Sequence, residues 1–313
     1  MSGVVDVTDV SPAVEDLYSA IEESARLLDV PCSRDEVLSV LAAYSDGLAE
    51  AMTVLAMAGG GERHRGELDY NFTVPSGGVD PYTVAVSNGF VERTDHPVGS
   101  LLADIQARCP ILNLGVECGL VGGFKKLYAF FPLDNLQRLS DLAEIPSMPR
   151  ALADNAATFA RYGLDDKVSI IGIDYVRKTM NVYFGRFPEE TVLPETVLAM
   201  VRDFGLPEPN EQMLEFIRKS FSIYPTFSWD SSEIKRVCFS VVTPDAEAFP
   251  ARMDPEIGKF ARNAPHAYPG ERVLVYGATL SPDGEYYKLG CYYRKPPEVF
   301  NKWQLFDKIV ERA

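Results

Sequence analysis

The sequence has few of the residues that mark metal-bound, disulfide-linked or nucleophilic sites. Its 313 residues include three histidines and five cysteines. The histidines lack metal-ligand spacing, and no two cysteines form a CxxC pair. No serine lies in a GxSxG motif, and no glycine-rich stretch ends in Gly-Lys-Ser or Gly-Lys-Thr. A DDxxD motif is missing too. These absences argue against a zinc site, a disulfide framework, a serine hydrolase, a P-loop and an all-helical terpenoid fold with a magnesium-bridged diphosphate.

Positive charge is also scarce. The chain has 30 Lys and Arg against 45 Asp and Glu, for a formal net charge of −15. A nucleic-acid or anionic-membrane partner needs net or clustered positive charge, so we expect neither. No apolar run approaches about 18 residues, the length that a membrane-spanning helix needs. Residues 1–9 lack a basic region followed by an apolar one, so no secretory signal is expected. The widely spaced cysteines then favour a reduced, cytoplasmic setting.

Several segments do show an unusual strand pattern, in which one face carries the charged and aromatic residues. Side chains alternate between the two faces of a strand, so residues 286–293 place Lys288 and Tyr292 on the same side. Residues 124–131 place Lys126 and Tyr128 together and Lys125 on the opposite face, and residues 236–242 divide in the same way. Cations, hydroxyls and rings from several strands therefore point into a common space. This pattern is typical of a barrel with a functional lumen and an apolar outer face under helices.

The order of elements supports a barrel of ten antiparallel strands. Helical spacing occurs at residues 13–28, 33–46, 97–108, 134–162, 193–219 and 255–262. Strand pairs are expected at 51–58 with 67–75, 111–117 with 125–131, 167–174 with 180–185, 220–228 with 236–243, and 272–280 with 285–293. No Pro/Gly/Ser-rich linker divides this weak repeat. We predict an α+β fold, a ten-stranded antiparallel β-barrel with a polar lumen surrounded by helices in ααββ repeats, as one domain over residues 1–313.

The residues expected to face the lumen suggest an anionic ligand. They are Asp69, Asn71, Lys126, Tyr128, Asn181, Tyr183, Ser222, Tyr224, Arg236, Ser240, Lys288 and Tyr292. Buried cations need a polyanion or paired carboxylates to compensate them, and a diphosphate would fit Arg and Lys together. The tyrosines would surround a flat substrate or shield a carbocation. The alternative is that the lysines lie in solvent at strand ends, paired with the abundant carboxylates, and that the tyrosines are ordinary core.

Six strings in the sequence carry a family resemblance. They are ELD at 67–69, GGFKK at 122–126, IPSMP at 145–149, FARYGL at 159–164, SFSIYPT at 220–226 and GEYYKLG at 284–290. With them the chain resembles the bacterial ABBA-fold aromatic prenyltransferases, most closely a geranyl-transferring member, over about residues 14–306. The resemblance implies the ten-stranded barrel already predicted. It also implies transfer of a dimethylallyl or geranyl group from its diphosphate to an aromatic carbon.

The resemblance also implies roles for individual residues. Lys126, Asn181, Tyr224, Arg236 and Lys288 match the family's diphosphate contacts, and Arg177 or Lys178 would fill a further basic position. Of these, Lys126, Arg236, Lys288 and Tyr224 would be catalytic. Asp69 matches the carboxylate that binds Mg²⁺ in the magnesium-dependent members. Tyr128, Ser169, Tyr183, Phe221, Ser222, Ser240 and Tyr292 would line the pocket for the prenyl chain and the acceptor, with a water held by Ser222 or Tyr292 taking up the released proton.

Four positions depart from the family's geranyl-transferring member. Ser169 stands in place of a glutamine, Ser240 of an alanine, Ala56 of a serine and Glu117 of an aspartate. The acceptor and the need for Mg²⁺ therefore stay open, and among acceptors the resemblance favours a dihydroxynaphthalene or a flaviolin-like compound. We expect a monomer that binds a prenyl diphosphate and a small aromatic. The alternative is a non-catalytic barrel that binds an anionic aromatic metabolite.

Overall fold

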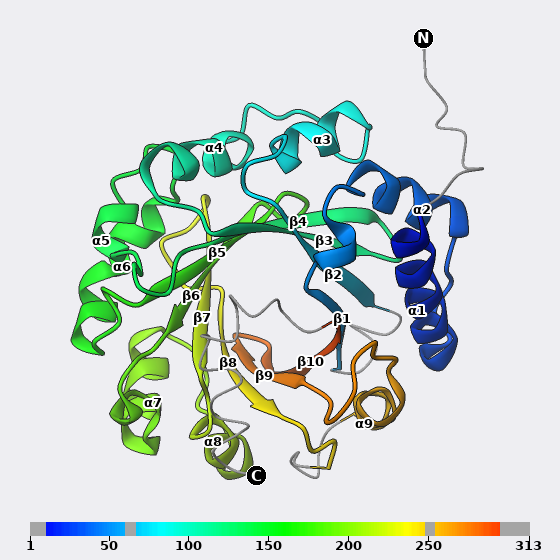
Figure 1. Ribbon diagram of the computed structural model, residues 1–313. Coiled ribbons are helices and arrows are strands. Elements are labelled where there is room, and N and C mark those ends of the chain that lie inside the picture. The colour runs from blue at the N-terminus through cyan, green and yellow to red at the C-terminus, as the bar shows by residue number, and fades with distance from the viewer. Residues whose placement is uncertain (1–10, 60–66, 248–253, 295–313) are drawn as a thin grey trace.

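Ten antiparallel strands form a closed barrel at the centre of the molecule, and the helices lie around it (Figure 1). The structure is a computed structural model that describes residues 11–59, 67–247 and 254–294. Around the barrel, each strand pairs with its neighbours in sequence, and β1 closes the ring by pairing with β10. The predicted fold class is confirmed.

The strands agree closely with the segments expected from the sequence. They are β1 (Thr53–Ala58), β2 (Leu68–Val74), β3 (Asn113–Gly119), β4 (Gly123–Phe130), β5 (Val168–Asp174), β6 (Thr179–Gly185), β7 (Ser222–Ser228), β8 (Arg236–Thr243), β9 (Leu274–Ser281) and β10 (Gly284–Arg294). The β9–β10 hairpin turns through Pro282 and Asp283, and Gly284 has a φ of +113°, which only glycine adopts readily. The Asp-Gly signal therefore marks a real hairpin.

Helices precede or follow each strand pair. They are α1 (Pro12–Leu28), α2 (Arg34–Ala43), α3 (Pro81–Ser87), α4 (Val98–Arg108), α5 (Leu139–Leu142), α6 (Arg150–Arg161), α7 (Pro194–Asp203), α8 (Glu211–Ile217) and α9 (Pro255–Asn263), with 3-10 turns η1 (Leu48–Glu50) and η3 (Glu189–Val192). Among the described residues, no helix is long and apolar enough to cross a membrane.

Local sequence explains where several helices begin and end. Ser33 accepts a hydrogen bond from the backbone N–H of Glu36, as its capping spacing predicted. The helical segments expected at 134–162 and 193–219 are both interrupted, the first before Arg150 and the second between Asp203 and Glu211. Prolines occur at both breaks, and a proline removes a backbone donor. Helix α3 was not predicted; Asp80 caps it and Pro81 starts it.

The two faces of the strands divide the molecule into an outer core and a lumen. Outward side chains such as Leu127 on β4, Phe184 on β6 and Phe239 on β8 are fully buried under the helices. A second, smaller apolar cluster lies apart from this core and is centred on Met52 and Phe130. Because Phe130 lines the cavity described below, the second cluster belongs to the inside of the barrel.

One side-chain direction differs from the alternation expected of a strand. Glu117 on β3 pairs with Lys126, but Cys118 pairs with Phe124, so Lys125 is an extra residue in β4. Such a β-bulge re-aims a side chain. Lys125 does not line the cavity, but its ammonium is not turned away from it as predicted, because it lies 2.5 Å from Oδ1 of the cavity-lining Asp69.

Candidate active site

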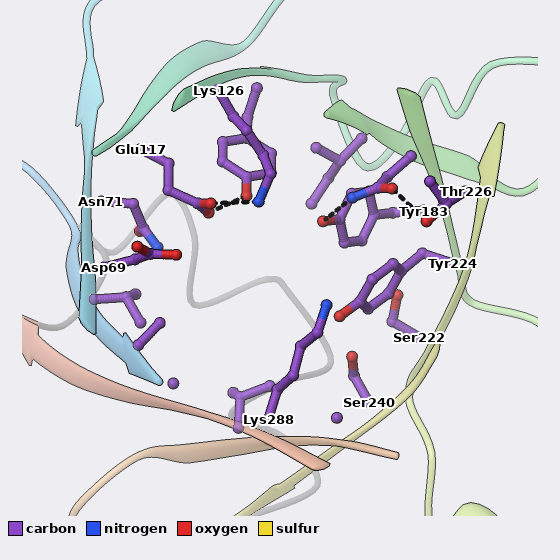
Figure 2. A pocket seen from close by; sticks show the side chains of 18 of the residues that line it. Asp69, Asn71, Glu117, Lys126, Tyr183, Ser222, Tyr224, Thr226, Ser240 and Lys288 are labelled. Carbon is purple, nitrogen blue, oxygen red and sulfur yellow. Dashed lines mark hydrogen bonds and ion pairs between the residues drawn. The ribbon is translucent and has the colours of Figure 1, made fainter. Parts of the chain in front are cut away.

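The barrel encloses a cavity of about 730 Å³ (Figure 2). Residues of all ten strands line it. Every residue named from the sequence as lumen-facing lines this cavity. The interior therefore has the polar and aromatic lining that was predicted from the alternation of side chains along the strands. Its size lies in the range of sites that enclose a small-molecule ligand.

The cavity has a charged half and an apolar half. Charged groups gather toward the end where the strand hairpins turn: Arg236 is the first residue of β8, Arg177 lies in the β5–β6 turn, and Asp69 is near the start of β2. Met52, Phe130 and Ile170 lie toward the opposite end. A ligand with one anionic end and one hydrocarbon end would match this division.

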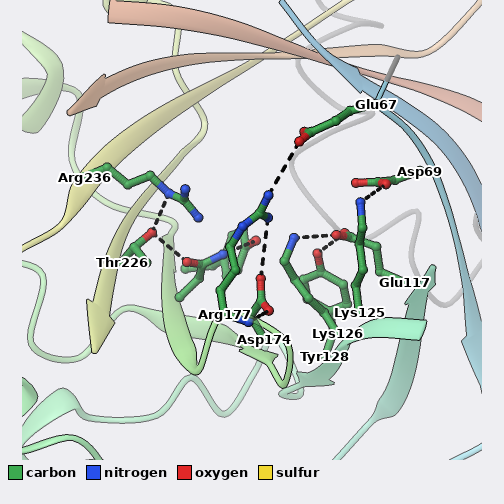
Figure 3. Close-up of polar contacts among 12 residues, drawn as sticks. Glu67, Asp69, Glu117, Lys125, Lys126, Tyr128, Asp174, Arg177, Thr226 and Arg236 are labelled. Atoms are coloured by element: carbon green, nitrogen blue, oxygen red, sulfur yellow. Dashed lines mark hydrogen bonds and ion pairs between the residues drawn. The ribbon is translucent and has the colours of Figure 1, made fainter. Parts of the chain in front are cut away.

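On the wall formed by β2, β3 and β4, the lysines are already paired with carboxylates (Figure 3). Lys125 binds Asp69, and Lys126 binds one oxygen of Glu117, whose other oxygen accepts a hydrogen bond from the hydroxyl of Tyr128. Burial alone would raise the pKa of Glu117, but Lys126, the Tyr128 hydroxyl and Lys125 together lower it. Burial and the nearby charge of Glu117 raise the pKa of Asp69.

On the wall formed by β8 and β10, two inward cations lack such partners among the described residues. In the described residues, no carboxylate lies within ion-pair distance of Arg236 or Lys288. Arg236 donates through Nε to the hydroxyl of Thr226 at 3.0 Å, and the Lys288 ammonium lies 5.7 Å from the centre of the Tyr224 ring. Burial lowers the pKa of Lys288, and the charge of Arg236 adds to this effect. These two cations are available to an anionic ligand.

Of the two candidates for the further basic position, only Arg177 reaches the cavity. Its guanidinium lies 3.6 Å from Glu67 and 3.8 Å from Asp174. Lys178 is exposed, has a φ of +49° and does not line the cavity. Asn181, the neutral member of the predicted diphosphate set, accepts a hydrogen bond from Thr226 at 2.7 Å. Thr226 therefore links Asn181 to Arg236.

Three tyrosines lie between the charged and the apolar half. The Tyr183 and Tyr224 rings stack with centroids 4.4 Å apart, and the Tyr128 ring meets Tyr183 edge-on at 6.2 Å. Burial raises the pKa of Tyr183 to about 12, so its hydroxyl stays protonated at neutral pH. Neutral rings present a negative π face that attracts cations. An allylic cation formed beside this group would be stabilised without a nucleophilic phenolate nearby.

In the apolar half, one region carries hydroxyls. Ser222 pairs across strands with Ser240, which pairs with Gly277. Ser222 and Ser240 are 8% and 7% exposed and point into the cavity (Figure 2). Ser169 donates a hydrogen bond to the backbone oxygen of Tyr183 at 3.1 Å, while Phe221 and Tyr292 supply aromatic surface. Small side chains here leave room for a flat ligand.

Several lining residues were not named as candidates from the sequence. Thr226 follows Tyr224 by two positions and was recoverable by extending the same alternation. Met52 and Ile170 had no signal that separated them from ordinary core. The ion pairs of Glu117 and Glu67 depend on the positions of strands that are distant in sequence, so no local pattern shows them.

The ten-stranded barrel ringed by helices, with its polar lumen, is the ABBA or PT-barrel fold. A family model described as aromatic prenyltransferase Orf2 matches residues 13–303. The chain belongs to this family of aromatic prenyltransferases, and the predicted enzyme class is confirmed.

Three relatives from Streptomyces are similar over nearly their whole length. A flaviolin linalyltransferase of Streptomyces virginiae is 46% identical over 294 residues, covering 94% of each chain. A 5,10-dihydrophenazine-1-carboxylate 9-dimethylallyltransferase of Streptomyces anulatus is 43% identical and covers 91% of this chain and 94% of its own. A furaquinocin biosynthesis prenyltransferase of Streptomyces sp. (strain KO-3988) is 47% identical and covers 91% and 92%. These relatives favour the catalytic interpretation over the non-catalytic barrel.

Proposed function

We propose that the protein transfers a dimethylallyl or geranyl group from its diphosphate to a carbon of a small hydroxylated aromatic in secondary metabolism. The observation that carries this proposal is the pair Arg236 and Lys288, two inward cations without carboxylate partners in the described chain, next to an apolar, hydroxyl-bearing half-cavity. The diphosphate would lie in the charged half and the prenyl chain and acceptor in the apolar half.

The proposed reaction begins when the donor's C1–O bond breaks. The bonding electrons leave with the diphosphate, and Arg236, Lys288 and Lys126 stabilise its growing charge. Preorganised charge of this kind is commonly the largest catalytic contribution. Tyr128, Tyr183 and Tyr224 shield the allylic cation from water, which would otherwise trap it as an alcohol. The aromatic carbon then attacks the cation, and loss of a proton restores the ring.

For the acceptor, we propose a dihydroxynaphthalene or a flaviolin-like compound. The hydroxyls of Ser222 and Ser240 are placed to bind oxygen substituents on one edge of such a ring. The name of one relative includes flaviolin as its acceptor, which supports this choice, whereas another relative's name includes a dihydrophenazine carboxylate. The relatives' names also include both a linalyl and a dimethylallyl group, so donor length is part of the test.

The decisive experiment combines the purified protein with dimethylallyl or geranyl diphosphate and a panel of these acceptors. We expect inorganic diphosphate release together with a prenylated aromatic detected by mass spectrometry. Tight binding of donor and acceptor with no turnover across the panel would contradict the proposal and support a binding protein.

Magnesium is a further proposal about the charged half. No group of three or more His, Cys, Asp or Glu side chains that could hold a metal occurs among the described residues. However, Mg²⁺ typically uses only one or two carboxylates together with substrate phosphates and water. Asp69 lines the charged half and fits that role. Lys125 already binds Asp69, so the ion would have to replace an ammonium group. Bound there, Mg²⁺ would supply positive charge beside the leaving diphosphate and stabilise it.

A further inference from the structure

The ring of Tyr128 occupies space that two glycines on the neighbouring strands leave open. Its cross-strand partners are Gly115 on β3 and Gly172 on β5. A Cβ atom on Gly172 would lie 3.0 Å from Cε1 of Tyr128, and one on Gly115 would lie 3.3 Å from its Cβ. Neither glycine has a positive φ, so they are needed for space and not for backbone conformation. The two glycines let the ring lie across the neighbouring strands.

A hydrogen bond to a buried carboxylate fixes the position of the Tyr128 hydroxyl. It donates a hydrogen bond to Glu117, which is only 6% exposed and also binds the Lys126 ammonium. Lys126 keeps Glu117 ionised, as its lowered pKa indicates. Burial, with the charge of Glu117, raises the pKa of Tyr128, which keeps the phenol neutral. A neutral hydroxyl bound to a buried carboxylate is the arrangement of a proton acceptor backed by a base.

The proposed reaction needs such an acceptor beside the apolar half of the cavity, where the aromatic substrate would lie. The alkylated ring must lose a proton, but water beside the allylic cation would capture it. Two other hydroxyls nearby have neutral partners: Ser169 donates to a backbone oxygen, and the Tyr183 hydroxyl accepts from the amide of Asn181. Tyr128, in contrast, connects the reaction space directly to a carboxylate.

We propose that Tyr128 and Glu117 form the proton exit of the reaction. The C–H bond at the alkylated carbon breaks, and its electron pair restores the aromatic ring. The proton binds the phenolic oxygen of Tyr128 while the original phenolic proton moves to the carboxylate of Glu117. Glu117 then passes a proton to the released diphosphate beside Lys126, and the product diphosphate carries it out. Tyr128 acts on the substrate, and Glu117 acts through Tyr128.

This proposal rests on the function proposed above, and its test uses the acceptor isotope effect. The acceptor is prepared with deuterium at the carbon that is alkylated. In the wild type, we expect donor ionisation to limit the rate, which would keep the isotope effect near one. In Tyr128→Phe, which leaves Glu117 and Lys126 in place, proton loss becomes limiting, and we expect an isotope effect of about twofold or more. The fraction of prenyl alcohol should rise as well.

Three controls separate proton transfer from simple damage to the site. Binding of a non-hydrolysable donor analogue, measured by calorimetry, shows that Tyr128→Phe is folded and holds the donor. Glu117→Gln should show the isotope effect, and Glu117→Asp should remove it again. Ser222→Ala tests the rival path through a water held at Ser222. A reduced rate in Tyr128→Phe with an isotope effect still near one, or an isotope effect that appears in Ser222→Ala instead, would overturn the proposal. Absence of any prenylated product in the wild type would instead refute the proposed function.

Discussion

Two walls of the cavity both carry positively charged side chains, but the partners of these side chains differ. On β2, β3 and β4, Lys125 and Lys126 bind Asp69 and Glu117. On β8 and β10, Arg236 and Lys288 have neighbouring hydroxyls and rings but, in the described segments, no carboxylate. Removing one partner of a buried ion pair leaves the other charge buried without compensation. The ion pairs of the first wall therefore contribute to stability as well as to binding. The second wall is arranged for a ligand that brings its own negative charge.

The largest effect is expected from the wall formed by β8 and β10. Arg236→Ala or Lys288→Ala should lower kcat with the prenyl diphosphate by about a hundredfold or more, because each change removes a preorganised donor at the leaving group. Steady-state kinetics with detection of released diphosphate measure this loss. Thermal unfolding should change little, since neither change breaks an ion pair within the described part of the chain. A loss of less than about tenfold in both variants would show that the diphosphate binds elsewhere.

On the wall formed by β2, β3 and β4, the sharpest test is the competition between Lys125 and Mg²⁺ for Asp69. EDTA should lower activity by about tenfold or more, on the scale of an electrostatic contact to the leaving group, and added Mg²⁺ should restore it. Asp69→Asn should abolish the response. Lys125→Met removes the competing ammonium, so half-maximal activity should need less Mg²⁺ than in the wild type. Full activity in EDTA would refute the metal proposal and leave Asp69 as a partner of Lys125.

The lowered pKa of Lys288 predicts a pH dependence that a paired lysine would not show. The ammonium binds diphosphate and the neutral amine does not, so kcat/KM for the donor should fall as the pH rises through the pKa of Lys288 in the free enzyme. That fall should begin below the pH of an ordinary lysine, which titrates near 10.4. Lys288→Arg should move the fall to higher pH. Identical profiles for the two proteins would contradict the assignment.

The smallest effect is expected where no charge is involved. Ser240→Ala removes one neutral hydroxyl from the acceptor region, and a single hydrogen bond is worth about 0.5–1.5 kcal/mol. We therefore expect KM for the aromatic acceptor to rise by roughly two- to tenfold, with little change in donor KM. Kinetics with each substrate varied in turn measure the two values. An equal rise in donor KM would place Ser240 near the diphosphate instead.

The strands and their inward residues were predictable because burial alternates with period two, a local property of the sequence. The position of Lys125 was not, since the bulge opposite Glu117 and Cys118 depends on how two strands pair. The choice between Arg177 and Lys178 also needed the structure, because a turn obeys no alternation. The same is true of Tyr128. Its direction toward the lumen was predicted correctly, but its hydrogen bond to Glu117 and its two glycine neighbours depend on the register between strands.

The closed ring of strands affects how this protein can change over time. With β1 paired to β10, the ring has no free edge, so the cavity cannot widen by peeling a strand away. Its capacity is instead set mainly by side chains on the lumen face of the strands. Substitutions at lumen positions such as Ser169, Ser240 or Ala56 can therefore alter which molecules fit at little cost to folding. In this barrel, the residues that determine substrate choice are therefore largely different from the residues that determine stability.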